Sequence, residues 1–138
     1  MDKHSGACHC GKIRFEVHSS PTLVEHCHCS SCRRLHGSAV TTLVGYAREN
    51  ITVILGTPVK YESSPGVYRT FCGTCGTRLF WESTAHEQEV YIALGAFDSP
   101  GDFPAQCHVW TSERLPWIEI ADGLPCYQAF KKDDGTGS

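Results

Sequence analysis

The sequence lacks the features that would place the chain in or across a membrane. No stretch approaches the roughly 20 consecutive apolar residues that a transmembrane helix needs. The first residues, Met1 to Gly6, contain no apolar core of a secretory signal peptide. We therefore expect no membrane partner and a cytoplasmic location, where thiols remain reduced.

Positive charge is scarce. Lysine and arginine number 12 against 15 acidic residues, so the net charge is −3 at pH 7. No basic run is longer than a dipeptide such as Arg33-Arg34. Nucleic-acid-binding proteins present a basic face to the phosphates, and this composition supplies none. We expect no nucleic-acid partner, which argues against a nucleic-acid-binding zinc ribbon.

Long amphipathic helices are also missing, because no window of about 11 residues shows a convincing 3.6-residue period. Short runs with alternating or β-branched residues are instead separated by turns rich in Gly, Pro and Ser. They predict an all-β sandwich or folded-over sheet, with one helical turn from Ser30 to His36. The expected strands cover residues 12–17, 38–44, 51–55, 67–71, 79–81, 90–94 and 117–120.

The length fits one domain. The 138 residues are 41% hydrophobic and 20% charged, which is typical of a globular chain with its own core. We expect a single domain over residues 1–130. The polar, Gly-containing residues 131–138 are expected to form a flexible C-terminal tail.

Cysteine is the residue that the sequence has in excess, with nine in the chain. A disulfide framework would favour an even number and a secreted context. The spacings C-x-C, C-x-C-x-x-C and C-x-x-C fit metal ligation better. The cysteines are Cys8, Cys10, Cys27, Cys29, Cys32, Cys72, Cys75, Cys107 and Cys126.

Two cysteine pairs share a local pattern, since a glycine directly follows the second cysteine of each. In metal-binding turns such a glycine adopts a positive φ, which lets backbone N–H groups point at the sulfurs. Together the pairs would give a closed four-thiolate zinc site of a structural kind. Its predicted ligands are Cys8, Cys10, Cys72 and Cys75.

The middle cluster, Cys27, Cys29 and Cys32, supplies three thiolates within six residues. Three protein ligands leave one tetrahedral position open, as in catalytic zinc sites, and a thiolate-rich shell favours a sulfur ligand there. The sequence thus predicts chemistry on a thiol or thioether adduct. Two alternatives stay open: one cysteine pair could join the triplet and leave the other as a redox pair, or a histidine could close the site. The candidate histidines are His26, His28 and His36.

Other side chains could act on a substrate. Arg33 and Arg34 could bind a substrate carboxylate, although solvated surface arginines would look the same in the sequence. His36 or His108 could donate a proton, since histidine titrates in the right range. The aromatic residues Trp110, Trp117 and Phe80 could line a pocket or simply fill the core. Cys107 and Cys126 are each isolated, which is typical of small buried side chains.

The cysteine pattern resembles the glutathione-dependent formaldehyde-activating enzyme family, also called the GFA or CENP-V family. The resemblance covers roughly residues 6 to 127 and includes Gly37-Ser38, His108 and Pro116-Trp117. The segments that carry it are Gly6-Ala7-Cys8-His9-Cys10-Gly11, Cys27-His28-Cys29-Ser30-Ser31-Cys32-Arg33, Phe71-Cys72-Gly73-Thr74-Cys75-Gly76 and Asp122-Gly123-Leu124-Pro125.

The resemblance implies folded-over antiparallel β-sheets and two zinc ions per chain. One would be structural, on the four paired cysteines, and one catalytic, on Cys27, Cys29 and Cys32. It also implies a carbon–sulfur lyase that forms or cleaves S-hydroxymethylglutathione, with glutathione or another small thiol as co-substrate and an aldehyde or thioether as partner substrate. The alternative is a non-catalytic zinc-binding interaction module of the same fold. Exposed strand edges would also permit a homodimer.

Overall fold

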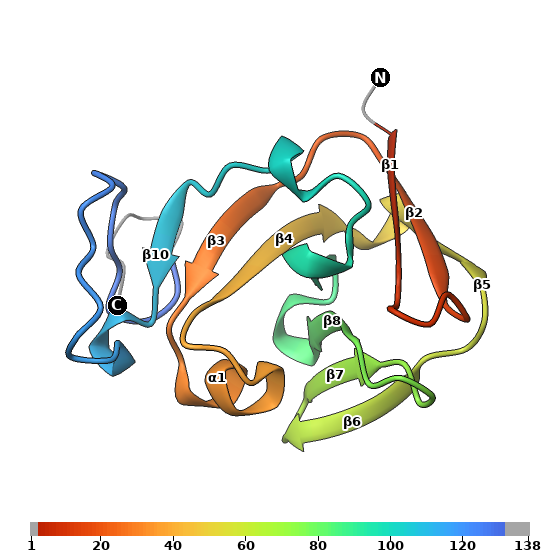
Figure 1. Cartoon of the computed structure of the whole chain (residues 1–138), viewed down its shortest axis with the longest axis horizontal. Coiled ribbons are helices and arrows are strands. Elements are labelled where there is room, and N and C mark those ends of the chain that lie inside the picture. Colours follow the sequence, from red (N-terminus) through yellow and green to blue (C-terminus); the bar gives the residue numbers. More distant parts are fainter. Residues whose placement is uncertain (1–2, 132–138) are drawn as a thin grey trace. The chain divides into compact units, whose positions relative to one another are not determined.

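The structure, a computed structural model, describes residues 3–131. The chain divides into two compact units, one formed by residues up to 23 together with 44–103, the other by residues 24–43 together with 104 onward. Figure 1 traces the elements along the chain. The expected single domain stays a prediction, and the expected tail lies, except for Lys131, outside the described residues.

The first unit contains two groups of antiparallel strands. A three-stranded sheet has the order β1 (Lys3–Ala7), β2 (Arg14–His18), β5 (Ile51–Leu55). A second group follows β9 (Glu89–Ala93), β8 (Arg78–Ser83), β7 (Val67–Phe71) and β6 (Val59–Ser64). Strand β4 (Thr41–Ala47) pairs beside β9 and belongs to this unit by its last four residues.

Aromatic side chains join the two sheets of this unit. Phe15 of β2 is fully buried and meets Phe80 of β8 edge to face, with ring centroids 5.5 Å apart. Phe97 also meets the ring of Phe15 edge to face, with ring centroids 5.4 Å apart. Gly6 leaves the space that the Phe15 ring occupies, because a Cβ at this position would lie 2.3 Å from Phe15 Cζ. Phe80 is therefore a core residue and not part of a pocket lining.

The second unit is built around a short parallel strand pair. Strand β10 (Cys107–Val109) pairs in parallel with β3 (Leu23–Cys27), and helix α1 (Ser30–His36) follows β3. The Cys29 sulfur caps α1 by accepting a hydrogen bond from the Cys32 N–H at 3.3 Å. Gly37 ends the helix with a φ of 65°. The parallel pair is an exception to the expected antiparallel pairing.

The all-β expectation and the helical turn are confirmed, with several shifts. The strand expected at 38–44 begins later, at Thr41, and β1, β3, β6 and β10 were not expected. The strand expected at 117–120 is wrong, since no strand is assigned there within residues 3–131. These residues alternate in sequence but form no bridge to a neighbouring strand among residues 3–131, and Trp117 is 71% exposed. β10 has three residues, too few to show a period.

Two strands carry apolar side chains at the surface of the first unit. The exposed large apolar residues on β5 and β6 are Val53, Ile54, Leu55, Val59 and Tyr61. Such edges can pair with another chain, and the homodimer stays a prediction. Within residues 3–131, none of the helices combines the length and the apolar character that crossing a bilayer requires.

Candidate metal centres

Four sulfurs from distant parts of the first unit meet as the sequence predicted. Cys8 and Cys10 follow β1, whereas Cys72 and Cys75 lie between β7 and β8. The Cys8 and Cys10 sulfurs are 3.6 Å apart, and those of Cys10 and Cys72 are 3.8 Å apart. Neighbouring sulfurs of a tetrahedral site with Zn–S bonds of about 2.3 Å lie about 3.8 Å apart. The tetrathiolate site, as we call these four residues, therefore fits zinc.

The local backbone of the tetrathiolate site follows from its two glycines. Gly11 has a φ of 82° and Gly76 a φ of 83°, which confirms the predicted positive-φ turns. Backbone N–H groups consequently reach the sulfurs. Ile13 donates to the Cys8 sulfur at 3.3 Å, and Cys75 donates to the Cys72 sulfur at 3.4 Å. These hydrogen bonds favour the thiolate form that a metal requires.

One ligand of this site is acidic even before a metal is considered. The Thr77 hydroxyl lies 3.2 Å from the Cys75 sulfur. Hydrogen bonds from that hydroxyl and from the Thr77 backbone lower the pKa of Cys75 to about 5. Cys75 is therefore a thiolate at neutral pH and is ready to bind a cation.

The second cluster, Cys27, Cys29 and Cys32, forms a group of its own in the second unit. Cys27 ends β3, Cys29 caps α1, and Cys32 lies in the first turn of that helix. Hydrogen bonds with Cys29 and Cys32, together with burial, raise the pKa of the Cys27 thiol. Three adjacent thiolates thus need a cation to balance them, so the trithiolate site, as we call these three residues, also fits a metal.

The alternatives for the cysteines are resolved by this grouping. The four-sulfur and three-sulfur groups share no member, so neither pair joins the triplet or remains as a redox pair. Within residues 3–131, no histidine nitrogen belongs to the three-sulfur group, which contradicts the histidine-closed alternative. None of the nine cysteines forms a disulfide, so the part of the chain that the structure describes carries no disulfide framework.

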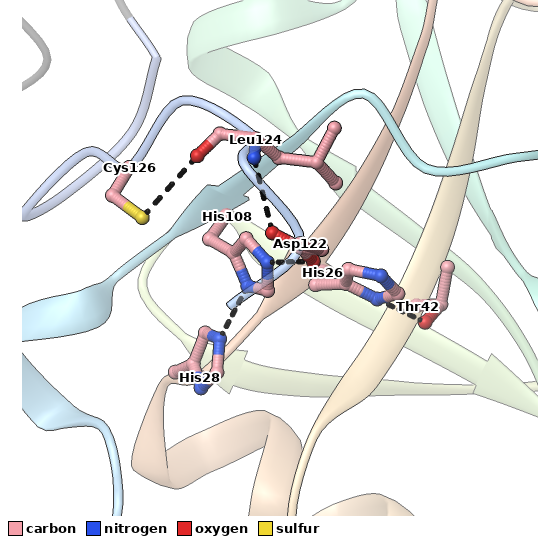
Figure 2. Close-up of polar contacts among 7 residues, drawn as sticks. All are labelled: His26, His28, Thr42, His108, Asp122, Leu124 and Cys126. Carbon is pink, nitrogen blue, oxygen red and sulfur yellow. Dashed lines mark hydrogen bonds and ion pairs between the residues drawn. The ribbon is translucent and has the colours of Figure 1, made fainter. Parts of the chain in front are cut away.

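A chain of hydrogen bonds runs through the second unit beside the trithiolate site. His28 Nε2 lies 2.9 Å from His108 Nδ1, and His108 Nε2 lies 2.8 Å from Asp122 Oδ2. Figure 2 shows His108 between His28 and Asp122. Both ring nitrogens of His108 are thus engaged. His26 binds separately through Nδ1 to the Thr42 hydroxyl at 2.7 Å.

The protonation states of the residues in this hydrogen-bond series follow from their surroundings. Hydrogen bonds from His108 and from the Leu124 N–H lower the pKa of Asp122. Burial, with the nearby histidines and arginines adding to it, lowers the pKa of His28 to about 4. His28 is therefore neutral at pH 7 and Asp122 is ionised. An ionised carboxylate only accepts, so His108 Nε2 donates to it.

The same residues include a third group that could hold a cation. Ligand atoms of His26, His108 and Asp122 lie within 4.8 Å of one another. We interpret the group as a hydrogen-bonded cluster, because His108 Nε2 and Asp122 Oδ2 already bind each other. The sequence reasoning missed Asp122 as a functional candidate. A signal was present in the Asp122-Gly123-Leu124-Pro125 turn, where the carboxylate accepts the Leu124 N–H.

Comparisons with known proteins agree with this geometry. The profile of the family described as "Glutathione-dependent formaldehyde-activating enzyme" matches residues 3–113. The chain belongs to the glutathione-dependent formaldehyde-activating enzyme family. A Halomonas elongata relative is 31% identical over 126 residues, covering 83% of this chain and 79% of its own, and is named "Putative glutathione-dependent formaldehyde-activating enzyme".

A solved structure supports the fold. A crystal structure of a Rhodobacter sphaeroides protein matches 88% of this chain and 98% of its own, with a TM-score of 0.58 and 20% identity. At this identity the likeness concerns the fold alone. The family profile covers both cysteine groups and His108, whereas Asp122 lies beyond it.

Arg33 and Arg34, the two candidate substrate-binding arginines, lie in different surroundings. Arg33 donates through Nη1 to the backbone carbonyls of His28 and Glu113, each at 2.9 Å. This nitrogen holds the chain together and does not face a ligand. Arg34 is exposed on α1. Substrate binding by either arginine stays a prediction, and the geometry favours Arg34.

The remaining sequence candidates are placed as follows. His36 is the last residue of α1 and lies one helical turn after Cys32. Trp110 has a positive φ of 56° and stacks edge to face on Phe130 at 5.3 Å. Cys107 is 1% exposed, as a small core residue would be, whereas Cys126 is exposed.

Proposed function

We propose that this protein is a zinc-dependent carbon–sulfur lyase that forms and cleaves the adduct of formaldehyde with glutathione or a related small thiol. The observation that carries the proposal is the trithiolate site, in which three sulfurs converge and no further ligand from residues 3–131 joins their group. The family supports the same conclusion. Nine cysteines without a disulfide among them also suit a reducing compartment, so we propose a cytoplasmic location.

Two zinc ions per chain would have different roles. Cys8, Cys10, Cys72 and Cys75 would hold a structural ion, because a closed four-thiolate set leaves no position for substrate. Cys27, Cys29 and Cys32 would hold the catalytic ion. When bound there, zinc would stabilise a substrate sulfur as thiolate at neutral pH.

The chain's own residues would bind the substrate and move the proton. Arg34 is the preferred partner for a substrate carboxylate, because Nη1 of Arg33 is occupied. His36 is the preferred proton donor. It follows Cys32 by four residues on α1, so both side chains lie on one helix face. His108 is less suitable, since both of its ring nitrogens are engaged.

The reaction balances without a further reactant. A bond forms between the thiol sulfur and the carbonyl carbon, and the C=O π bond opens. The oxygen takes a proton from His36, and the proton released by the thiol restores the histidine. In the cleavage direction the same proton returns, and the carbon–sulfur bond breaks to give aldehyde and thiol.

Cobalt substitution tests whether the trithiolate site accepts a thiol. We expect two equivalents of Co²⁺ per chain, both with intense sulfur-to-metal charge-transfer absorption. Adding glutathione should change the spectrum of one ion only, because only the trithiolate site has an open position. Exchange NMR of ¹³C-formaldehyde with glutathione should show faster exchange with the zinc-loaded protein. Two ions that ignore thiols, together with no acceleration, would favour the non-catalytic interaction module.

His36→Gln tests the proton donor. We expect the turnover rate to fall by about 10²- to 10³-fold, because a positioned general acid typically contributes about 10²- to 10⁴-fold. The metal content should remain unchanged. His18→Gln is a matched control, since His18 is an exposed histidine at the end of β2. A His36→Gln protein with full turnover would transfer the role to another group.

A further inference from the structure

The loop that carries the trithiolate site is held by residues much later in the chain. This cysteine loop, as we call residues 27–32, forms hydrogen bonds through its backbone to the segment after β10. The His28 N–H donates to the Val109 carbonyl at 3.1 Å. The Ser30 N–H donates to Glu113 Oε1 at 2.7 Å, within the 3-10 turn η5 (Thr111–Glu113). Two backbone positions of the loop are thereby fixed.

The side chain of His28 supplies a third anchor. His28 is 1% exposed, and its Nε2 bonds to His108, which is 6% exposed. His108 in turn bonds to Asp122, whose side chain is 42% exposed. Asp122 is itself fixed, because its other oxygen accepts the Leu124 N–H at 3.0 Å. A continuous series of bonds therefore connects an exposed carboxylate with the residue between two candidate metal ligands (Figure 2).

We propose that Asp122 and His108 are positioning residues of the trithiolate site. Acting through His28, they hold the peptide between Cys27 and Cys29 in the conformation that brings the three sulfurs together. The inference rests on the proposed function in one respect: the trithiolate site must bind a metal.

The physical reason is the cost of organising a loop when the ion binds. The His108 ring is held in one orientation because both of its nitrogens are hydrogen-bonded. Its Nδ1 therefore holds the His28 ring in a matching orientation. If the Asp122 carboxylate is removed, the His108 ring regains rotational freedom. The cysteine loop must then become ordered when the ion binds, which makes the free energy of metal binding less favourable. The cost falls on the trithiolate site, because His28 separates two of its members.

A competition titration with Co²⁺ against a chromophoric chelator tests the proposal on the full chain. For Asp122→Ala we expect the trithiolate site to bind Co²⁺ about 10- to 100-fold more weakly, as when hydrogen-bonded partners of metal ligands are lost in other proteins. The visible d–d bands of that ion should also change shape. The tetrathiolate site provides an internal control in the same sample and should keep its affinity.

Further variants separate positioning from general destabilisation. His108→Phe should weaken the site as Asp122→Ala does, whereas Asp122→Asn retains an acceptor oxygen and should restore much of the affinity. Asp102→Ala is a matched control, because it breaks another exposed carboxylate–histidine pair, with His4 at 3.3 Å. It should leave both affinities unchanged. If His108→Phe fails to fold, the Co²⁺ affinities of the two Asp122 variants test the proposal by themselves, because Asp122 is exposed.

The outcomes are distinguishable. If the unaltered protein binds Co²⁺ at the trithiolate site and Asp122→Ala binds it equally well, the positioning role is overturned and the proposed function stands. Equal weakening at both sites, with a lowered melting temperature, would also overturn it in favour of a stability effect. If the unaltered trithiolate site binds no Co²⁺, the proposed function and this inference both fail.

Discussion

Cys72→Ala is expected to abolish the cooperative folded state of the protein near room temperature. Cys72 is 2% exposed, and its sulfur accepts the N–H groups of Thr74 and Cys75. Structural zinc contributes about 10 kcal/mol or more to folding, whereas a whole domain is stable by about 5–15 kcal/mol. Circular dichroism during heating, combined with metal analysis, should show the loss of the unfolding transition together with the loss of one zinc.

Cys107→Ala is the matched control for this prediction. Cys107 is as buried as Cys72, at 1% exposure, but it belongs to neither cysteine group. Its truncation should cost only about 1–2 kcal/mol, the effect of a small cavity, and the transition should remain cooperative. If Cys72→Ala melts no lower than Cys107→Ala, the four-sulfur group is not the structural element that we infer.

Cys29→Ala is expected to remove the proposed lyase activity while the chain remains folded. Losing a metal ligand should reduce turnover by at least about 10³-fold, more than the 10- to 100-fold effect of losing a partner that orients a ligand. The structural zinc would be retained, so the melting transition should persist. Exchange NMR and thermal melts on the same preparation measure both properties.

Cys29 has a second role that must be separated from metal binding. Its sulfur caps α1, and losing a cap costs about 1 kcal/mol. Cys29→Ser keeps an oxygen at the cap but is a poor ligand for a thiolate-rich zinc site. Both variants should therefore be inactive, and the serine variant should melt higher. Melts of Cys29→Ala and Cys72→Ala that resemble each other would contradict the division into catalytic and structural sites.

Much of the two candidate metal sites could be predicted because each cysteine turn is local. A cysteine pair followed by a glycine encodes its own geometry: Gly76 takes a φ of 83°, and the Cys75 N–H then reaches the Cys72 sulfur within a few residues. Helix α1 was predictable for the same reason, since Gly37 ends it and its N-cap is one of the clustered cysteines. The strands made of β-branched or aromatic runs between turn residues, such as β5 and β7, were also predicted with their bounds.

The strand predictions failed where the hydrophobic pattern of a segment does not match its backbone pairing in the fold. The expected strand at 117–120 alternates in sequence, yet a strand needs a neighbour to satisfy its backbone groups, and Trp117 lies exposed. β10 has no period to detect in three residues and exists because β3 pairs with it in parallel.

By itself, the sequence determined which cysteines gather into the two groups that could hold a metal, that the chain is built of strands, and which family it belongs to. The cysteine turns could be predicted because each depends on contacts between residues a few positions apart, whose energies are set by local backbone geometry. Only the tertiary structure decided that Nη1 of Arg33 binds carbonyl groups, that both nitrogens of His108 are engaged, and that Asp122 connects to His28. These contacts join residues up to 80 positions apart. Their formation depends on how strands pair and side chains pack, which no local pattern specifies.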